Sequence, residues 1–383
     1  MRLAIVGASA RAAACSALEA GHRVVAADLF ADADLVASCP ATRITDWPQG
    51  FGPWLASQEC DGWLYTGGLE NYPDLVDQWA AVRPLLGAGG PVLGLVRNPT
   101  TLAKMLTTAD VAFPMTLPAL PDQEPVGQWL VKPLRSSGGG GVRRWQGDMR
   151  LEEGEFLQQL IEGTPISAVY TSNGQAATCW GVTRQLIAPP WTHATGYKYA
   201  GSIGPISLNP ASRQAIERVG QVLAAATGIV GVWGADFILH SDGTPWVIEV
   251  NPRYTASMEV VERATGQSAV GLHLLACCER RLPQEAPRPP ARILGKAYLY
   301  APTGVMPDER WTSSVHQLAS QRQAADIPFP GVPIAQGFPV TSLFAWGTSV
   351  GEVETQLRDK LAELTFRLPP AVRPILAADE GPT

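Results

Sequence analysis

The sequence predicts an α/β fold that begins with a doubly wound parallel sheet. Short apolar runs typical of strands alternate with helix-like stretches over residues 2–97, and alternation of this kind produces a parallel sheet with helices on both faces. The chain has 383 residues, of which 46% are hydrophobic. At about 150 residues per domain, this length predicts two or three domains, each with a core of its own.

In the N-terminal part, apolar runs bounded by Gly, Asp or Pro mark four expected strands, at 2–6, 23–27, 61–65 and 91–96. Two helices are expected between them, at 11–20 and 71–82. The first helix is rich in Ala and ends at Gly21. The second has Asn71 as its cap and Pro73 in its first turn, and both residues favour a helix start there.

After residue 97 the pattern changes to separate helices and alternating strands, with a proline-rich segment at 283–290 that is typical of a linker. The expected helices are 100–109, 210–227 and 349–364, and the expected strands include 128–133, 230–240, 244–250, 292–300 and 340–345. We therefore expect four units, at 1–97, 98–160, 161–282 and 291–368.

Composition excludes several classes of protein. The chain carries 29 basic and 35 acidic residues, a net charge of −6, which argues against nucleic-acid binding because that needs a basic surface. No apolar run reaches the roughly 20 residues of a membrane span, and Leu3–Ala10 is better explained as a strand and turn than as a signal peptide. The six cysteines lack metal-site spacing. We therefore expect a cytoplasmic protein with reduced thiols.

The strongest chemical pattern is a polar hairpin, in which Asp242-Gly243 forms the turn between two apolar strands. Asp236 lies on the first strand, while Glu249 and Asn251 lie two residues apart on the second and hence on one face. Two carboxylates and an amide oxygen are hard ligands suited to Mg²⁺ bound with nucleotide phosphates. Arg253 follows at the same alternation and suits a phosphoryl oxygen or an oxyanion. The alternative is an ordinary hairpin with a polar outer face.

A second pattern combines one lysine with a glycine-rich backbone. Lys132 ends an apolar strand, and a Ser/Gly run follows at 136–141. One cation and many backbone N–H groups suit a polyphosphate, and the expected donors are Ser137, Gly138, Gly139 and Gly140. A flexible linker is the alternative. Further along, the apolar edge Glu155–Gly163 offers the backbone of Gln159, Leu160 and Ile161 to an adenine ring.

Together these patterns resemble the ATP-grasp superfamily. Asn98–Pro114, with Lys104, is similar to the family's first lysine helix, and Val131–Pro133 with 136–141 is similar to its second lysine and glycine loop. Residues 158–163 resemble its adenine hinge, and the polar hairpin has the order of its Mg²⁺ ligands and phosphate arginine. The resemblance implies an ATP-grasp fold with an N-terminal Rossmann-like domain, a central lid, a mixed-sheet nucleotide domain and a small C-terminal α+β appendage.

The resemblance also implies an ADP-forming carboxylate–amine ligase with ATP and Mg²⁺ as cofactors. The γ-phosphoryl group would pass to a carboxylate, and an amine would attack the acylphosphate, with Lys104, Lys132 and Arg253 as catalytic residues. Val6–Arg11 and Gly67–Pro73 resemble ATP-grasp proteins linked to methanofuran and tetrahydromethanopterin, which are one-carbon coenzymes. This favours addition of an amino acid or glutamate to a small cofactor precursor.

Two alternatives stay open. One is a biotin-independent carboxylase of the purine type that forms carboxyphosphate, although the turn Gly7–Arg11 lacks the Gly-Gly-Gln pattern of those enzymes. The other is a nucleotide-binding protein without catalysis. The C-terminal unit resembles the β-rich appendage of biotin carboxylase and the purine-pathway carboxylases, and on that ground we expect a homodimer.

Candidate substrate residues lie in two regions. Parallel sheets bind ligands at the carboxyl ends of their strands, and the residues expected there are Ser9, Arg11, Gly68 and Glu70. A loop after the central strands adds His193, Tyr197 and Lys198, which suit a flat anionic acceptor, and Arg184 on the preceding strand is a candidate for phosphate contacts. The alternatives are a loop held by packed aromatic rings and a helix cap at Glu70-Asn71.

Overall fold

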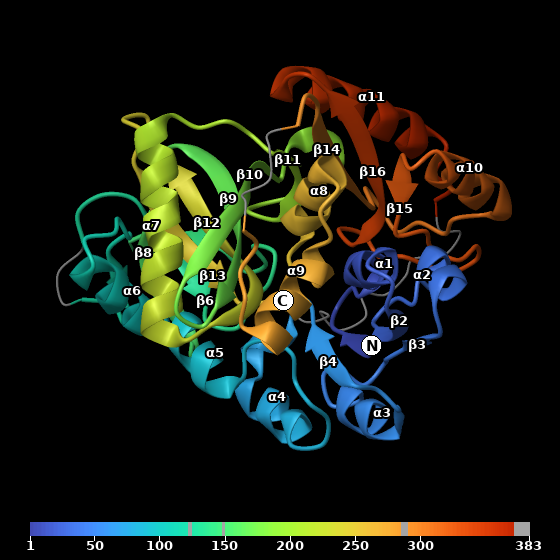
Figure 1. The fold of residues 1–383 in the computed structure, drawn as a ribbon. Helices are drawn as coiled ribbons and strands as arrows, with labels where there is room; N and C mark the ends of the chain where they lie inside the picture. Colours follow the sequence, from blue (N-terminus) through green and yellow to red (C-terminus); the bar gives the residue numbers. More distant parts are fainter. Residues whose placement is uncertain (122–124, 148–149, 285–289, 371–383) are drawn as a thin grey trace.

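The computed structural model describes residues 1–121, 125–147, 150–284 and 290–370. Its strands form three sheets: a four-stranded sheet in the order β3-β2-β1-β4, a four-stranded sheet in the order β5-β8-β6-β7, and an eight-stranded sheet in the order β13-β12-β9-β10-β11-β14-β16-β15. Figure 1 shows the N-terminal elements in blue at one end of the molecule, with the C-terminal helices α10 and α11 lying above them.

The N-terminal sheet is parallel, as the sequence predicts. Its strands are β1 (Arg2–Val6), β2 (Arg23–Asp28), β3 (Ala41–Arg43) and β4 (Gly62–Tyr65), and its helical segments are α1 (Arg11–Glu19), α2 (Ala33–Ser38), α3 (Phe51–Ser57), η1 (Leu69–Asn71) and α4 (Pro73–Ala80). Four of the five residues of β1 are buried, which is typical of a parallel strand covered on both faces.

The expected strand at 91–96 is wrong, because Gly90–Val96 forms helix α5. Pro91 occupies the first turn of this helix, a position that favours a helix start. A six-residue apolar run has no periodicity that separates a buried strand from a buried helix. Leu85 instead makes the parallel bridge to Trp63 beside β4.

The second sheet is small and antiparallel, and it follows helix α6 (Pro99–Thr108). Its strands are β5 (Thr116–Leu117), β6 (Trp129–Pro133), β7 (Arg143–Arg144) and β8 (Glu155–Gln159). Trp129, Val131 and Leu157 form its buried cluster. This sheet supplies Lys132 and the glycine-rich run to the candidate site.

The eight-stranded sheet is antiparallel at every described pairing, and strands of the 291–368 region extend it directly. Its strands are β9 (Thr164–Asn173), β10 (Ala177–Ile187), β11 (Tyr199–Gly204), β12 (Val230–Leu239), β13 (Pro245–Asn251), β14 (Ile293–Tyr300), β15 (Ala324–Ala325) and β16 (Pro339–Gly347). The remaining helical segments are η2 (Pro190–Thr192), α7 (Pro210–Thr227), α8 (Ala256–Thr265), α9 (Ala269–Glu279), α10 (Glu309–Ser320) and α11 (Val350–Phe366).

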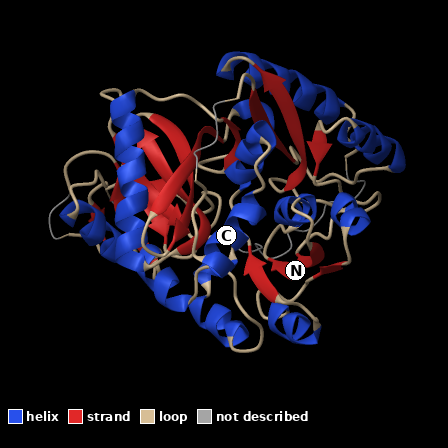
Figure 2. Ribbon diagram, viewed as in Figure 1, coloured by secondary structure: helices blue, strands red, loops and turns tan. Residues whose placement is uncertain are grey.

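Helices cover both faces of this sheet (Figure 2). On one face, Tyr170 stacks on Trp233 at 4.3 Å and donates its hydroxyl to the Ile216 carbonyl of α7. On the other face, His273 of α9 accepts a 3.0 Å hydrogen bond from the Val232 N–H. The Trp233 side chain belongs to the same buried cluster as Leu223 of α7, and the Val232 side chain to the same cluster as Leu272 of α9. Adjacent residues of β12 therefore face opposite helices, as strand alternation requires.

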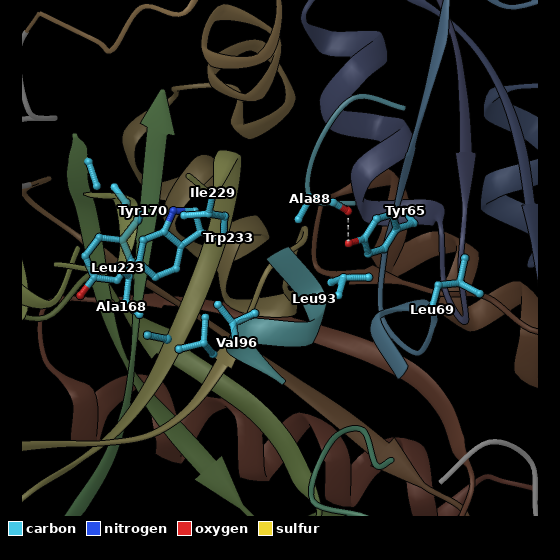
Figure 3. Close-up of a cluster of buried hydrophobic side chains, with 14 of the residues drawn as sticks. Tyr65, Leu69, Ala88, Leu93, Val96, Ala168, Tyr170, Leu223, Ile229 and Trp233 are labelled. Atoms are coloured by element: carbon cyan, nitrogen blue, oxygen red, sulfur yellow. Dashed lines mark hydrogen bonds between the residues drawn. The ribbon is translucent and has the colours of Figure 1, made fainter. Parts of the chain in front are cut away.

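One apolar cluster joins the N-terminal sheet to the eight-stranded sheet. Helix α5 contributes Leu93 and Val96 to it, and Figure 3 shows them between Tyr65 of β4 and the Tyr170–Trp233 stack. Leu93 is fully buried. The two sheets are therefore packed through α5 rather than connected by a flexible linker.

Within the described residues, no helix is both long enough and apolar enough to cross a membrane.

Replacing Leu93 by Ala should lower the free energy of unfolding by about 2–4 kcal/mol, because it opens a cavity where the two sheets meet. Leu120→Ala is the matched control, since Leu120 is 38% exposed and should cost under about 0.5 kcal/mol. Urea denaturation followed by circular dichroism measures both. Equal losses in the two variants would show that α5 does not join the sheets.

Candidate active site

The β12–β13 hairpin brings three of the predicted metal ligands together. Asp236 pairs directly with Glu249, and Gly234 pairs with Asn251. A bulge leaves Ile248 without a partner, so Val247 stays in the core opposite Phe237 while Glu249 faces the site. The Asn251 amide donates to Asp236 Oδ2 at 3.0 Å. The side chains are thus adjacent, as the spacing predicts, and their role as ligands stays a prediction.

Asp236 is a half-buried carboxylate whose direct partners are amide groups. Its Oδ1 accepts a 2.9 Å hydrogen bond from the Gln185 amide of β10. Burial, and then the nearby Glu249 carboxylate, raise the pKa of Asp236 to about 6. Two carboxylates side by side repel each other, and a positive charge between them would relieve that repulsion.

Arg97 is the cation at this site that sequence reasoning missed. It forms an ion pair with Glu249 Oε1, and its Nη2 donates to Asn71 Oδ1 at 2.9 Å and to the Ser136 carbonyl at 3.1 Å. Its Nε–H is buried and has no acceptor among the described residues. Burial opposes ionisation of Glu249, but Arg97 and Lys132 outweigh it and lower the pKa of Glu249. The signal for Arg97 was present, since a basic residue directly follows an apolar run, as at Lys132.

The structure does not bring Lys104 to this site. Lys104 is exposed on α6, whose buried side chains are Leu102 and Leu106. A residue two positions from each of these lies on the opposite face of a helix, because successive residues are about 100° apart. Arg97, which directly precedes the helix cap Asn98, reaches the hairpin instead.

Arg253 is held by a carboxylate from the N-terminal sheet. Its Nε and Nη2 donate to Glu70 Oε1 at 2.8 and 2.7 Å, and its Nη2 also donates to Asn251 Oδ1 at 3.1 Å. Glu70 reaches this position from η1, directly after Gly68. Gly68 has φ of +98°, and a Cβ there would lie 2.7 Å from the Trp47 ring, so the turn requires glycine.

Lys132 lies on the other side of the hairpin. Its Nζ donates to Gln158 Oε1 at 3.0 Å and to the carbonyl of the bulged Ile248 at 3.4 Å. Burial lowers the pKa of Lys132. A buried ammonium with only neutral direct partners is suited to a further anion.

The glycine loop 136–141 is docked against two neighbours. The Ser136 carbonyl accepts from Arg97 and, at 3.3 Å, from the Asn71 amide. The Gly138 carbonyl accepts from the Tyr199 N–H at 2.8 Å. Gly139 has φ of +79°, and a Cβ there would collide with the Tyr197 carbonyl, so this close approach requires glycine.

Of the three backbone positions proposed for adenine, two already have partners. Gln159 N–H donates to the Met115 carbonyl and Leu160 N–H to the Gln128 carbonyl, both at 2.8 Å. Ile161 N–H makes no such bond in the part of the chain that the structure describes. The N–H available to a ligand is therefore that of Ile161.

Arg184 lies on the wrong face for phosphate. Thr183 of β10 is opposite Ser167, which is itself opposite Asp236, and Gln185 also reaches Asp236. Alternation turns Arg184 to the other face, where its guanidinium lies 3.6 Å from Glu354 of α11.

Arg11 is committed to carboxylates rather than free for a substrate. Its guanidinium lies 2.5 Å from Glu259 Oε1 and 2.8 Å from Asp326 Oδ1, and only 4% of Arg11 is exposed. Lys296 lies 2.7 Å from Glu259 and 3.6 Å from Asp326. These four residues form an ion cluster that joins α1, α8 and β14.

The remaining substrate candidates have separate positions. The Ser9 carbonyl accepts from the Thr66 hydroxyl at 2.9 Å. His193 and Tyr197 are half-buried in the loop before β11. Lys198 Nζ donates to the Gly337 carbonyl at 3.1 Å and lies 5.9 Å from the Tyr300 ring centre. This loop therefore adjoins the glycine loop, while Ser9 lies at the carboxyl end of β1.

Residues 96–257 match the family model of the ATP-grasp domain. The protein carries an ATP-grasp domain. The matched region contains Arg97, Lys132 and the complete β12–β13 hairpin, whose polar residues therefore belong to this domain.

Comparisons beyond the ATP-grasp domain extend the likeness over nearly the whole chain. The L-amino acid ligase from Bacillus licheniformis has a TM-score of 0.67 at 20% identity, covering 96% of this chain and 97% of that one. The N5-carboxyaminoimidazole synthetase from Staphylococcus aureus complexed with ADP has a TM-score of 0.65 at 16% identity, covering 94% and 96%. At these identities the likeness establishes an ATP-grasp fold.

A sequence match reaches the carbamoyl phosphate synthase large chain of Neisseria gonorrhoeae. It is 36% identical over 77 residues, which is 20% of this chain and 7% of that protein. The match therefore spans a small part of a much larger protein.

Replacing Asp236 by Asn should raise the free energy of unfolding by about 1–2 kcal/mol at pH 8. The pKa of Asp236 in the folded chain is raised to about 6. Between the ordinary pKa of an aspartate and this value, Asp236 keeps its proton in the folded chain and loses it in the unfolded chain. The wild type therefore loses stability as the pH rises through this interval, and the variant does not. Urea denaturation at pH 4.5 and pH 8 measures the difference.

Asp242→Asn is the control for this prediction, because Asp242 is in the turn of the same hairpin. Hydrogen bonds from Thr244 lower the pKa of Asp242 to about 2, so its charged form stabilises the fold above the ordinary carboxyl pKa. This variant should lose stability at pH 8. A gain in Asp242→Asn, or none in Asp236→Asn, would contradict the electrostatic account.

Proposed function

We propose that the protein is an ADP-forming ATP-dependent ligase that joins a carboxylate to an amine through a carbon–nitrogen bond. One observation carries the proposal: the opposed Asp236 and Glu249 are surrounded by three buried or half-buried cations, Arg97, Lys132 and Arg253. Alternating charges of this kind suit a metal–polyphosphate complex rather than an apolar ligand.

The donor set of the hairpin fits Mg²⁺. Asp236 and Glu249 supply two opposed carboxylates, and Asn251 supplies an amide oxygen, which are the hard oxygen ligands that Mg²⁺ takes alongside nucleotide phosphates. Among the described residues no group of three or more His, Cys, Asp or Glu side chains forms a metal site, so phosphate oxygens and water would complete the shell. When bound, the ion would offset the carboxylate repulsion and the phosphate charge.

The nucleotide would lie between the small sheet and the hairpin. We assign the Ile161 N–H to the adenine edge and Lys132 to the phosphates, with backbone N–H groups of 137–139 as further donors. The Gly140 N–H, which the sequence also offered, already donates to the Ser137 carbonyl at 3.2 Å. The loop would cover the phosphates and exclude water, which protects a reactive acyl intermediate from hydrolysis.

The proposed chemistry has two steps. A carboxylate oxygen of the substrate takes the γ-phosphoryl group of ATP, so that ADP leaves and an acylphosphate forms. The neutral amine of the second substrate then attacks the acyl carbon, loses a proton and expels phosphate. Arg253 is placed to hold the charged oxygens in both steps because it bridges Glu70 and Asn251 at the hairpin end.

For the substrates we propose an amino acid or glutamyl group added to a small cofactor precursor of one-carbon metabolism, in a cytoplasmic homodimer. The support is the resemblance of Val6–Arg11 and Gly67–Pro73 and the fold shared with an L-amino acid ligase.

A purine-type carboxylation through carboxyphosphate is the second candidate, favoured by the fold shared with a carboxyaminoimidazole synthetase. ADP release separates the candidates. Release that needs an acid and an amine supports the ligase, release that needs bicarbonate supports the carboxylase, and nucleotide binding without release under any of these conditions supports a non-catalytic protein. The candidate substrates tested in this ADP-release assay are glutamate, tyrosine, tyramine and pterin acceptors.

Glu249→Gln should keep the fold and lower substrate-dependent ADP release by more than about 100-fold, because it removes a charged ligand from the metal–phosphate site. Coupled ADP assays with saturating Mg·ATP measure the rate, and circular dichroism checks the fold. Lys104→Ala and Arg184→Gln are the controls, since the structure places both side chains away from the hairpin, and each should stay within about threefold of wild type. Near-normal turnover in Glu249→Gln would overturn the metal assignment.

A further inference from the structure

Glu70 carries a buried oxygen without a partner. Its side chain is fully buried, and both hydrogen bonds from Arg253 go to Oε1. Oε2 accepts no hydrogen bond from any described residue. Buried carboxylate oxygens are nearly always paired, so an unpaired one at a functional site calls for a donor from outside the fold.

The polar groups beside Glu70 on the fold are already committed. The Tyr65 hydroxyl donates to the Ala88 carbonyl at 2.8 Å, and the Asn71 amide donates to the Ser136 carbonyl at 3.3 Å. Arg253 Nη1 donates to the Tyr254 carbonyl at 3.3 Å. Each of these groups already has a partner on the fold, and none of them donates to Oε2.

We propose that Glu70 Oε2 binds the protonated α-amine of the substrate whose carboxylate is activated, so that this substrate is an α-amino acid. The inference rests on the proposed ligase function. Arg253 links Glu70 to Asn251 of the hairpin, and a carboxylate held by Arg253 would face the metal and phosphates. The ammonium of an α-amino acid is one carbon away from that carboxylate, which places it beside Glu70.

Charge favours the same substrate class. Arg97 and Arg253 are each already paired with a carboxylate, and nucleotide phosphates would add further negative charge. A substrate that carries only a carboxylate would increase this excess, whereas a zwitterion brings its own positive charge.

Gly67 lies between Arg253 and the glycine loop. A Cβ on Gly67 would lie 3.6 Å from the Arg253 guanidinium carbon and 3.7 Å from Ser137 Oγ of the glycine loop. The loop therefore covers this corner, and its movement would admit the amino acid. A larger residue at 67 would occupy the same space.

The test measures binding and does not depend on turnover. Isothermal titration of the full chain, with Mg²⁺ and the non-hydrolysable β,γ-methylene analogue of ATP, uses two matched probe pairs: glutamate against glutarate, and tyrosine against 3-(4-hydroxyphenyl)propionate. Wild type should bind at least one amino acid about 10- to 100-fold more tightly than its deaminated counterpart. Glu70→Gln should abolish this preference.

Glu354→Gln is the matched control, because Glu354 also pairs with an arginine but lies on the far face of the sheet. It should keep the wild-type preference. A wild type without any preference for the amino acids, or a Glu70→Gln variant that retains one, overturns the proposal. The comparison of amino acids with their deaminated counterparts in the wild type tests the proposal even if the Glu70→Gln variant does not fold.

The failures of the two proposals differ. Suppose that ADP release depends on Glu249 and needs an amine acceptor, but occurs only with acids that lack an α-amino group. That result would support the ligase and overturn the amine site. Amino-acid binding that depends on Glu70, with no ADP release by any acid and amine pair, would keep the amine site and overturn the ligase.

Discussion

The opposition of Asp236 and Glu249 across one pair of antiparallel strands is the constraint on which the site depends. Two half-buried carboxylates in direct register repel each other, because the protein around them screens charge less than water does. The chain responds by bringing cations from separate elements, with Arg97 from the end of α5 and Lys132 from β6. Helix α5, strand β6 and the hairpin therefore meet around the charges of Asp236 and Glu249.

A second ion cluster lies farther along the same face of the eight-stranded sheet. Helix α8, which begins just after Arg253, carries Glu259, and this carboxylate pairs with both Arg11 and Lys296. Buried ion pairs contribute little net stability, since desolvation offsets their attraction, but removing one partner is costly. The cluster therefore serves to align the N-terminal helix α1 with β14, and through α8 that alignment reaches the hairpin.

The hairpin was predictable because both its turn and its alternation are local properties of the sequence. Strand pairing around Asp242-Gly243 decides which side chains meet, and no distant contact is needed for that inference. The misassigned residues depended on other things. Residues 91–96 are apolar without periodicity. The face of α6 that carries Lys104 is set by what packs against that helix. The face of Arg184 relative to Asp236 depends on the pairing of β9 with β12, which lie far apart in the sequence. Arg97 follows an apolar run as Lys132 does, but it is the tertiary fold that brings it beside Glu249.

Arg97 also links the charge of the hairpin to the glycine loop. One guanidinium serves Glu249, Asn71 and the Ser136 carbonyl at once. A divalent ion on Glu249 would compete for the oxygen that Arg97 now holds, because both act on the same carboxylate. Arg97 thereby couples the charge on the Glu249 carboxylate to the position of the glycine loop.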